Sequence, residues 1–291
     1  MIMIPVTAED AGKTVLAILQ KRIPGAPRAY LRQLLRRGKV QYAGKALAED
    51  HFLHGGETLH LPDSERLRKL CSTDLPPLEI LLEADTFLAV FKPAGLAVHS
   101  SAGHEQDNLT ARVRTWMQYR KAPYMVAPVH RLDVGTSGPV LFGKGRKAIA
   151  ELGRILQTGP CSKIYLALVR GMPPETGMLT SAVRVQDKTK HAATRFRVLG
   201  RHRDAALLEL ELLSGRKHQI RQQCADAGWP VYGDRRYGGS GLIGLERLFL
   251  HCGQLSWPAG TGMPDHCVTA PLPEELLCIL RCLHIDPPSP A

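Results

Sequence analysis

The densest group of reactive side chains lies in residues 130–138, which read His-Arg-Leu-Asp-Val-Gly-Thr-Ser-Gly. A carboxylate such as that of Asp133 can act as a nucleophile or as a base. The two glycines allow backbone and substrate to come close, and the two hydroxyls can fix the loop through local hydrogen bonds. Taken alone, this composition also suits a structural turn, so the residues leave both interpretations open.

Two later segments carry groups that could serve such a carboxylate. Residues 213–221 read Leu-Ser-Gly-Arg-Lys-His-Gln-Ile-Arg, and an arginine beside a carboxylate favours its ionised form and fixes its orientation. Tyr165 lies in an apolar stretch and offers an aromatic ring. The alternatives are a solvated basic helix start and a core tyrosine.

These segments resemble the motifs of the RluA-type pseudouridine synthases. Residues 130–138 match the family signature His-Arg-Leu-Asp-x-x-Thr-Ser-Gly at every specified position. Four further elements follow the family order: Lys-Pro-x-Gly-x-x-Val-His at 92–99, Lys-x-Tyr at 163–165, Thr-Gly-Arg-x-His-Gln-Ile-Arg at 214–221 with serine replacing threonine, and Pro-x-x-Gly-Asp-x-x-Tyr-Gly at 230–238. The resemblance extends over residues 78–275.

The resemblance implies an enzyme that breaks the bond between ribose and uracil, rotates the base and rejoins it through carbon. In this family the signature aspartate is catalytic, the tyrosine lies against the target base, and the final arginine pairs with the aspartate. Carried over, these roles fall on Asp133, Tyr165 and Arg221. We also expect RNA contacts from four residues of the same motifs: His130, Arg131, Thr136 and Arg216.

The chain departs from the family pattern at two places. Pro139 follows the signature where an aliphatic residue is usual, and Ser256-Trp257-Pro258 replaces an aromatic residue and His-Pro near the end. Because proline lacks a backbone donor, we expect a bulge or an edge position at Pro139. Neither departure touches Asp133, Tyr165 or Arg221.

Positive charge is concentrated near the start of the chain. Residues 11–48 contain nine Lys or Arg and no Asp or Glu. Two short amphipathic helices are predicted, at 14–19 and 31–37, separated by a Pro-Gly break at 24–27. A strand and turn at 39–45 and a strand at 57–61 complete a small module.

The second predicted helix is the candidate RNA contact of this module. Arg32, Arg36 and Arg37, followed by Lys39, could lie along a phosphate backbone, and a solvated helix face is the alternative. Residues 12–62 resemble the small RNA-binding module first known from ribosomal small-subunit protein four. We call this segment the S-four-like module.

The expected fold is α+β, with a β-rich, mixed-sheet pseudouridine synthase catalytic domain behind a small α/β RNA-binding domain. The predicted division is the S-four-like RNA-binding domain at 1–62, a linker at 63–77, the catalytic domain at 78–285 and a loose tail at 286–291. Within the catalytic domain, strands are predicted at 78–82, 87–91, 164–169 and 207–212, and helices at 109–120, 146–157 and 217–227.

Composition favours a polyanionic partner. The chain has 291 residues with 38 Lys and Arg against 27 Asp and Glu, a formal charge of +11, which favours nucleic acid through counterion release. The seven cysteines include no Cys-x-x-Cys pair, so we expect neither a disulfide framework nor a metal site. Cys278 and Cys282 are predicted to be buried on one helix face.

Localisation and assembly are expectations of the same kind. The first residues lack the basic start and apolar stretch of a signal peptide, and no run reaches membrane-spanning length. We therefore expect a cytoplasmic protein without a membrane partner, acting as a monomer and without a cofactor.

The function that follows is isomerisation of specific uridines to pseudouridine, with large-subunit ribosomal RNA as the preferred target and transfer RNA as the alternative. A non-catalytic RNA-binding or ribosome-assembly protein on the same fold is a rival that retention of Asp133, Tyr165 and Arg221 disfavours. A hydrolase with paired carboxylates is another, but the signature holds one acid and no evident second.

Overall fold

The computed structural model describes residues 1–23, 26–71, 78–105, 107–158, 161–185, 188–259 and 265–287. The chain forms two compact units, the first made of Met1–Pro77 with Arg114–Pro123 and the second of Leu78–Val113 with Tyr124–Ala291. Among the described residues, no helix has both the length and the apolar character needed to cross a bilayer.

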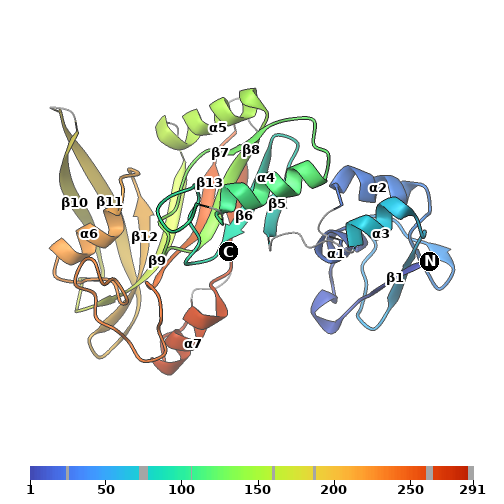
Figure 1. The fold of residues 1–291 in the computed structure, drawn as a ribbon. Coiled ribbons are helices and arrows are strands. Elements are labelled where there is room, and N and C mark those ends of the chain that lie inside the picture. Colours follow the sequence, from blue (N-terminus) through green and yellow to red (C-terminus); the bar gives the residue numbers. More distant parts are fainter. Residues whose placement is uncertain are drawn as a thin grey trace. The chain divides into compact units, whose positions relative to one another are not determined.

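The first unit, which begins in blue in Figure 1, combines a small antiparallel sheet with short helices. The strand order is β1-β4-β2-β3. The bounds in chain order are β1 (Ile2–Pro5), the 3-10 helix η1 (Ala8–Asp10), α1 (Val15–Arg22), α2 (Arg28–Arg36), β2 (Gln41–Tyr42), β3 (Lys45–Ala46), β4 (Thr58–Leu61) and α3 (Glu65–Cys71). Both predicted helices and the predicted strands of this module are confirmed.

Helices α1 and α2 form where their apolar residues recur on one face. Thr14 caps α1 by accepting a hydrogen bond from the Ala17 amide, and α2 is followed by Gly38 at φ 62°, the left-handed conformation typical of helix ends. Ile18 and Leu31 are fully buried in the unit's core, so the charged face of α2 is left outward.

The segment expected to be a linker, 63–77, is more ordered than predicted. Helix α3 occupies part of it, and Leu67 and Leu70 join the apolar core of the first unit. Two predicted features fall partly outside the described residues, namely the Pro-Gly break, through 24–25, and the linker, through 72–77. The same holds for the tail, of which 288–291 are not described.

The second unit is built on two sheets. The larger has the order β10-β11-β12-β9-β13-β14 and the smaller β5-β6-β8-β7, and all pairs between named strands are antiparallel. The strands are β5 (Glu79–Glu83), β6 (Phe87–Lys92), β7 (Val126–Pro128), β8 (Gly138–Lys144), β9 (Ser162–Arg170), β10 (Thr176–Val185), β11 (Lys188–His202), β12 (Ala205–Leu212), β13 (Leu250–Trp257) and β14 (His266–Thr269).

A parallel bridge between Ser137 and His251 connects the two sheets. The Cys252 amide donates to the Ser137 carbonyl at 2.8 Å, so β8 begins beside β13. Gly138 lies at this junction with φ 138°, and a β-carbon there would overlap the Cys252 carbonyl. The last glycine of the 130–138 segment is therefore required by close approach of two strands.

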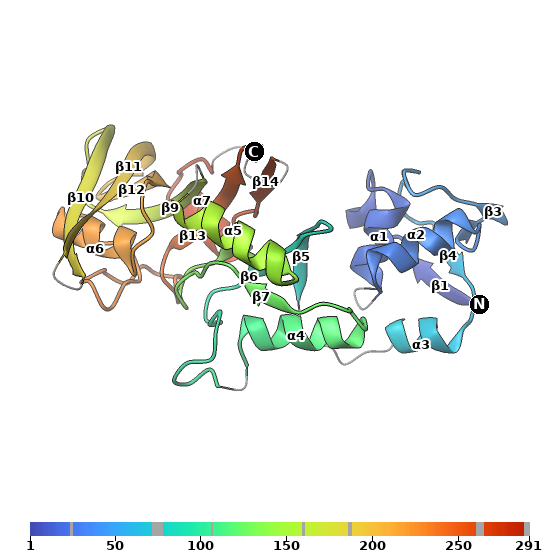
Figure 2. The same ribbon diagram turned by 90° about the horizontal axis from the view of Figure 1, so that it is seen from above.

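Three helices pack on the sheets of the second unit: α5 (Arg146–Thr158), α6 (Gln219–Asp226) and α7 (Glu274–Cys282). The residues of α4 (Leu109–Tyr119) are divided between the two units, with the division after Val113. Figures 1 and 2 show α5 over the strands of this unit. It packs against β8, and Leu152 and Ile155 share an apolar cluster with Phe87 and Leu255. Helix α6 lies against β10. These elements confirm the α+β class and the strands and helices predicted for this part.

One expectation in this unit is wrong, and one of two alternatives expected at Pro139 is found. Cys278 and Cys282 are exposed, because α7 turns Leu276, Ile279 and Leu280 inward instead. Pro139 pairs with Phe91 without a register shift, so no bulge forms and the residue has the expected edge position at the start of β8. The missing donor is tolerated because β7 pairs with β8 only from Phe142 onward.

Within the altered segment at 256–258, Trp257 belongs to the core. Trp257 is 3% exposed and its ring meets Phe87 edge to face, with centroids 5.5 Å apart. Such a pair adds to the burial of both rings. This departure from the family pattern therefore affects packing between β13 and β6.

Candidate active site

A cavity of about 800 Å³ opens in the second unit, lined by the loop before β8, by β9 and by the start of α6. Asp133, Tyr165, His218 and Arg221 all line it. Its volume is in the range of sites that enclose a small organic group, which suits a single extruded nucleotide. The three residues predicted to carry the chemistry thus meet around one space.

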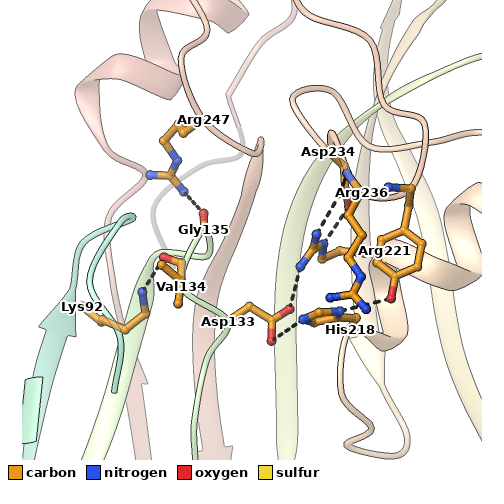
Figure 3. Close-up of polar contacts among 10 residues, drawn as sticks. Lys92, Asp133, Val134, Gly135, His218, Arg221, Asp234, Arg236 and Arg247 are labelled. Carbon is orange, nitrogen blue, oxygen red and sulfur yellow. Dashed lines mark hydrogen bonds and ion pairs between the residues drawn. The ribbon is translucent and has the colours of Figure 1, made fainter. Parts of the chain in front are cut away.

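Asp133 lies between two basic side chains (Figure 3). The Arg221 guanidinium approaches Oδ2, with Nη1 at 3.5 Å, and His218 Nε2 lies 3.7 Å from Oδ1. Both partners come from the start of α6, far along the chain. Each carboxylate oxygen therefore faces its own nitrogen.

Arg221 makes its shorter contacts with a different acid. Its Nε and Nη2 donate to the two oxygens of Asp234 at 2.7 and 2.8 Å, and Asp234 is 1% exposed. Burial opposes ionisation of Asp234, but the hydrogen bonds from Arg221 lower its pKa below the ordinary value. Two parallel bonds fix a guanidinium rigidly, so Asp234 aims Arg221 at Asp133.

Lys92 fixes the Asp133 loop through backbone carbonyls. Its side chain is fully buried and donates to the carbonyls of Pro93, Leu96 and Val134 at 2.8, 2.8 and 3.1 Å. The Gly95 amide donates to the same Val134 carbonyl. Burial, reinforced by the charge of Arg247, lowers the pKa of Lys92 to about 7.

Arg247 holds the same loop from the other side (Figure 3). Its Nη2 donates to Gly135 O at 3.3 Å and to Ser137 Oγ at 2.9 Å, while Nη1 pairs with Glu275 of α7 at 2.9 Å. His251 completes this group because its Nε2 faces the Ala270 carbonyl and its Nδ1 faces Ser137 Oγ at 2.9 Å. The acceptor on Ala270 implies that Nε2 carries the proton and that Ser137 donates to Nδ1.

Tyr165 lies on β9, paired with Leu210 and Cys252 on the neighbouring strands. Its side chain lines the cavity although the residue is only 8% exposed. Burial, with the nearby Cys252 and Asp133, raises the pKa of Tyr165. Its hydroxyl therefore stays protonated at neutral pH, and the ring offers an apolar wall.

The other expected contacts have varied surroundings. His130 Nε2 accepts from the Leu141 amide at 3.0 Å, and burial lowers its pKa to about 3, so the ring is neutral and oriented by the protein. Thr136 is 2% exposed and its amide donates to Asp133 O. Arg131 is exposed. The Nε of Arg216 is buried without a hydrogen-bond partner among the described residues, and Arg216 lines the cavity.

In the first unit, the four basic residues predicted to contact RNA differ in exposure and in ion pairing. Arg36, Arg37 and Lys39 are exposed. Arg32 instead pairs with Glu49, at 3.0 Å from Nε to the carboxylate. Three of the four basic residues are thus available to a polyanion without breaking an ion pair to Glu49.

Sequence reasoning missed the groups that hold the site residues. Asp234 and Lys92 appeared only as members of the motifs at 230–238 and 92–99, and neither was given a role. Arg247 belongs to none of the matched motifs. Each acts through carbonyls or a carboxylate that only the folded chain brings near.

Comparison with known proteins agrees with this geometry. Residues 86–226 match the family model described as RNA pseudouridylate synthase. The ribosomal large subunit pseudouridine synthase C of Escherichia coli K12 is 32% identical over 97% of this chain and 95% of its own length. The enzyme of the same name from Pasteurella multocida is 30% identical, over 97% of this chain and 93% of its own.

A solved structure shares the fold. Human RNA pseudouridylate synthase domain containing 4 superposes with a TM-score of 0.63 at 23% identity, covering 72% of this chain and 95% of that one. The chain belongs to the RluA-type family of RNA pseudouridine synthases. It is an isomerase that acts on uridine in RNA.

Proposed function

We propose that the protein isomerises specific uridines of large-subunit ribosomal RNA, with Asp133 as the catalytic carboxylate. The observation that supports this most strongly is the setting of Asp133, which projects into the cavity between His218 and Arg221. A positioned carboxylate in an enclosed space can act on an extruded nucleotide and keep the freed base from leaving.

Tyr165 and Arg221 have supporting roles in this proposal. The protonated Tyr165 ring forms the wall against which the base stacks. Arg221, aimed by Asp234, keeps Asp133 ionised and oriented. His130, Arg131, Thr136 and Arg216 complete the RNA-facing set around the cavity, with His130 acting through the shape of the loop.

The choice of RNA rests on the relatives and on charge. The matched relatives are named ribosomal large subunit pseudouridine synthase C, and the match extends over 97% of this chain, including the basic first unit. We propose that residues 1–62 bind RNA backbone through Arg36, Arg37 and Lys39, with Arg32 joining after release from Glu49.

We propose that the protein acts as a monomer in the cytoplasm, where ribosomal RNA is modified in bacteria. Substrate and product contain the same atoms, so the isomerisation consumes no oxidant, reductant or energy-rich partner.

The test combines cells and purified protein. Pseudouridine is mapped across ribosomal and transfer RNA in cells that lack the gene and carry wild type, Asp133→Asn or Asp226→Asn. Asp226 is exposed on α6 outside the cavity, so this matched change should restore the same large-subunit positions as wild type. Asp133→Asn should restore none yet bind RNA normally, because it removes charge and keeps shape.

Two results would contradict the proposal. Lost modification confined to transfer RNA would refute the ribosomal target and leave the role of Asp133 standing. Restoration by Asp133→Asn would remove Asp133 from the chemistry.

A further inference from the structure

His218 has a backbone conformation that histidine rarely adopts. It precedes α6 with φ 55° and ψ 22°, in the left-handed region. For a residue with a β-carbon this conformation costs free energy, and it persists where neighbouring contacts enforce it, often at functional sites.

The neighbouring Gln219 enforces this turn. Its amide nitrogen donates to Ala193 O and Thr194 Oγ1 at 3.0 and 2.9 Å, and its Oε1 accepts from Ser214 Oγ and the Arg216 amide, each at 3.0 Å. Gln219 is 5% exposed. The turn that carries His218 is thus tied to β11 and held in one shape.

The result of this turn is a line of three polar groups. His218 Nε2 lies 3.7 Å from Asp133 Oδ1, and Nδ1 lies 3.1 Å from the Tyr237 hydroxyl. The first distance is longer than a hydrogen bond, but catalytic hydrogen bonds are often long before substrate binds and tighten in the complex. The imidazole is therefore poised between a carboxylate and a phenol.

The partners select one tautomer. A carboxylate can only accept, so the proton of a neutral ring is favoured on Nε2, facing Asp133. Nδ1 is then an acceptor for the Tyr237 hydroxyl, which can donate. Tyr237 itself is held by two cations, because the guanidinium carbons of Arg221 and Arg236 lie 5.2 and 5.7 Å from its ring centre.

The charges around His218 keep it neutral. Burial lowers its pKa; the Asp133 carboxylate opposes this, and the cations Arg221, Arg236 and Lys217 reinforce it. At neutral pH the ring therefore has one proton. The Tyr237 hydroxyl, by donating to Nδ1, keeps that proton on Nε2, which faces Asp133.

We propose that His218 is a positioning residue for the reaction, a neutral donor to Asp133 Oδ1 whose tautomer is held by Tyr237. With Arg221 on Oδ2, it orients both oxygens of the carboxylate toward the nucleotide. This inference rests on the proposed role of Asp133. Asp234, Arg221, Tyr237 and His218 then form one connected support for a single acid.

Single-turnover kinetics on an RNA fragment that contains the target uridine test this role. His218→Asn removes the imidazole, while asparagine tolerates the left-handed backbone. The rate of isomerisation at saturating enzyme should fall by about 100-fold, the cost of misplacing a reacting group by about 1 Å. The Kd for RNA should stay unchanged, since Asp133 orientation is not a binding contact.

Tyr237→Phe tests the role of the tautomer more specifically, because it removes only the hydroxyl. The ring and its contacts with both cations are kept. At neutral pH we expect a smaller loss of rate, because Nε2 no longer has a fixed proton. Because the pKa of His218 lies below the ordinary 6.5, its imidazole gains the second proton only on further acidification. There both nitrogens carry protons, so the variant should recover relative to wild type at the same pH. A purely structural defect has no reason to recover in acid.

Two comparisons separate this inference from the proposed function. Asp226→Asn, on the same helix, should match wild type in rate and in pH profile. An active Asp133→Asn variant would overturn the assignment of Asp133, and the role of His218 with it. The role of His218 alone would be overturned if Asp133→Asn is inactive and one of two results is found. The first is a wild-type rate in His218→Asn, and the second is no recovery of Tyr237→Phe in acid.

Discussion

Three buried or half-buried basic side chains lie around Asp133, and each contacts a different residue of its loop. Arg221 contacts the Asp133 carboxylate, Lys92 the Val134 carbonyl, and Arg247 the Gly135 carbonyl. Cations are costly to bury without partners, and here carbonyls and carboxylates provide them. The loop is thereby held at successive residues, and the side chain of Asp133 is left facing the cavity.

Arg221 is expected to act through geometry as well as charge. Arg221→Lys keeps a positive charge but loses the two parallel bonds to Asp234, so the isomerisation rate should fall by about 100-fold. Arg221→Ala leaves Asp234 buried without its partner and should lower the free energy of unfolding by about 3–5 kcal/mol. Single-turnover assays and denaturant titration measure the two effects, and a fully active Arg221→Lys would show that charge alone suffices.

Lys92 should leave a signature in the pH dependence of stability. Its pKa in the folded state, about 7, lies below the ordinary 10.5, so between these values the unfolded chain binds more protons. Stability should therefore rise with pH across this window. Lys92→Met lacks the titrating group, so the difference in unfolding free energy between wild type and variant should grow from pH 7 to 9, and parallel curves would contradict it.

At the scale of elements, the start of β8 decides where the Asp133 loop lies. The Ser137–His251 bridge joins β8 to β13, and Gly138 allows the two backbones to approach. Helix α6 then delivers His218 and Arg221 to the opposite side of the same carboxylate. The site is thus assembled from a strand junction and a helix start.

Gly138 offers a test of this junction with a matched control. Gly138→Ala places a methyl group on Cys252, whereas Gly145→Ala, also at positive φ, meets nothing within 4 Å. Gly145→Ala should cost about 1–2 kcal/mol from backbone strain alone. Gly138→Ala should lower the free energy of unfolding by about 1–3 kcal/mol more than Gly145→Ala, because of overpacking, and should slow isomerisation. Equal losses of Tm in the two variants would argue against the close approach of β8 and β13.

At the scale of the whole molecule, we propose that the two units have separate tasks, catalysis in the second and RNA binding in the first. The second unit contains the described cavity, and the first contributes exposed basic residues on a small folded core. Arg120 donates to the Ala26 carbonyl within the first unit, so deletion of the N-terminal residues would remove an acceptor from a buried guanidinium. Surface substitution is the cleaner way to test binding.

The triple variant Arg36→Ala, Arg37→Ala, Lys39→Ala should weaken RNA binding without altering the chemical step. Each lost phosphate contact reduces the slope of log K against log salt by about 0.7–0.9, so the slope should flatten by about 2. Binding titrations from low to physiological salt measure this, with single-turnover rate at saturation as the control. An unchanged slope would assign the first unit another purpose.

Local pattern was enough to predict much of this protein from its sequence. The apolar spacing around Leu31 and Leu34 predicted α2, because helix periodicity is a property of neighbouring residues. The composition of 130–138 drew attention to Asp133 but left a structural turn as an alternative, and the resemblance gave Asp133 its expected role. Family resemblance added Tyr165 and Arg221 and gave the fold class that the structure confirms.

Tertiary structure decided how these residues are supported. Asp133 and Arg221 are 88 residues apart in sequence, and no local pattern states that Asp234 orients the arginine, that Lys92 and Arg247 bond the carbonyls after Asp133, or that His218 faces its second oxygen. Nor could it show that Cys278 turns outward. Such relations depend on which strands meet and which backbone atoms they leave unpaired, and those are set only when distant segments pack together.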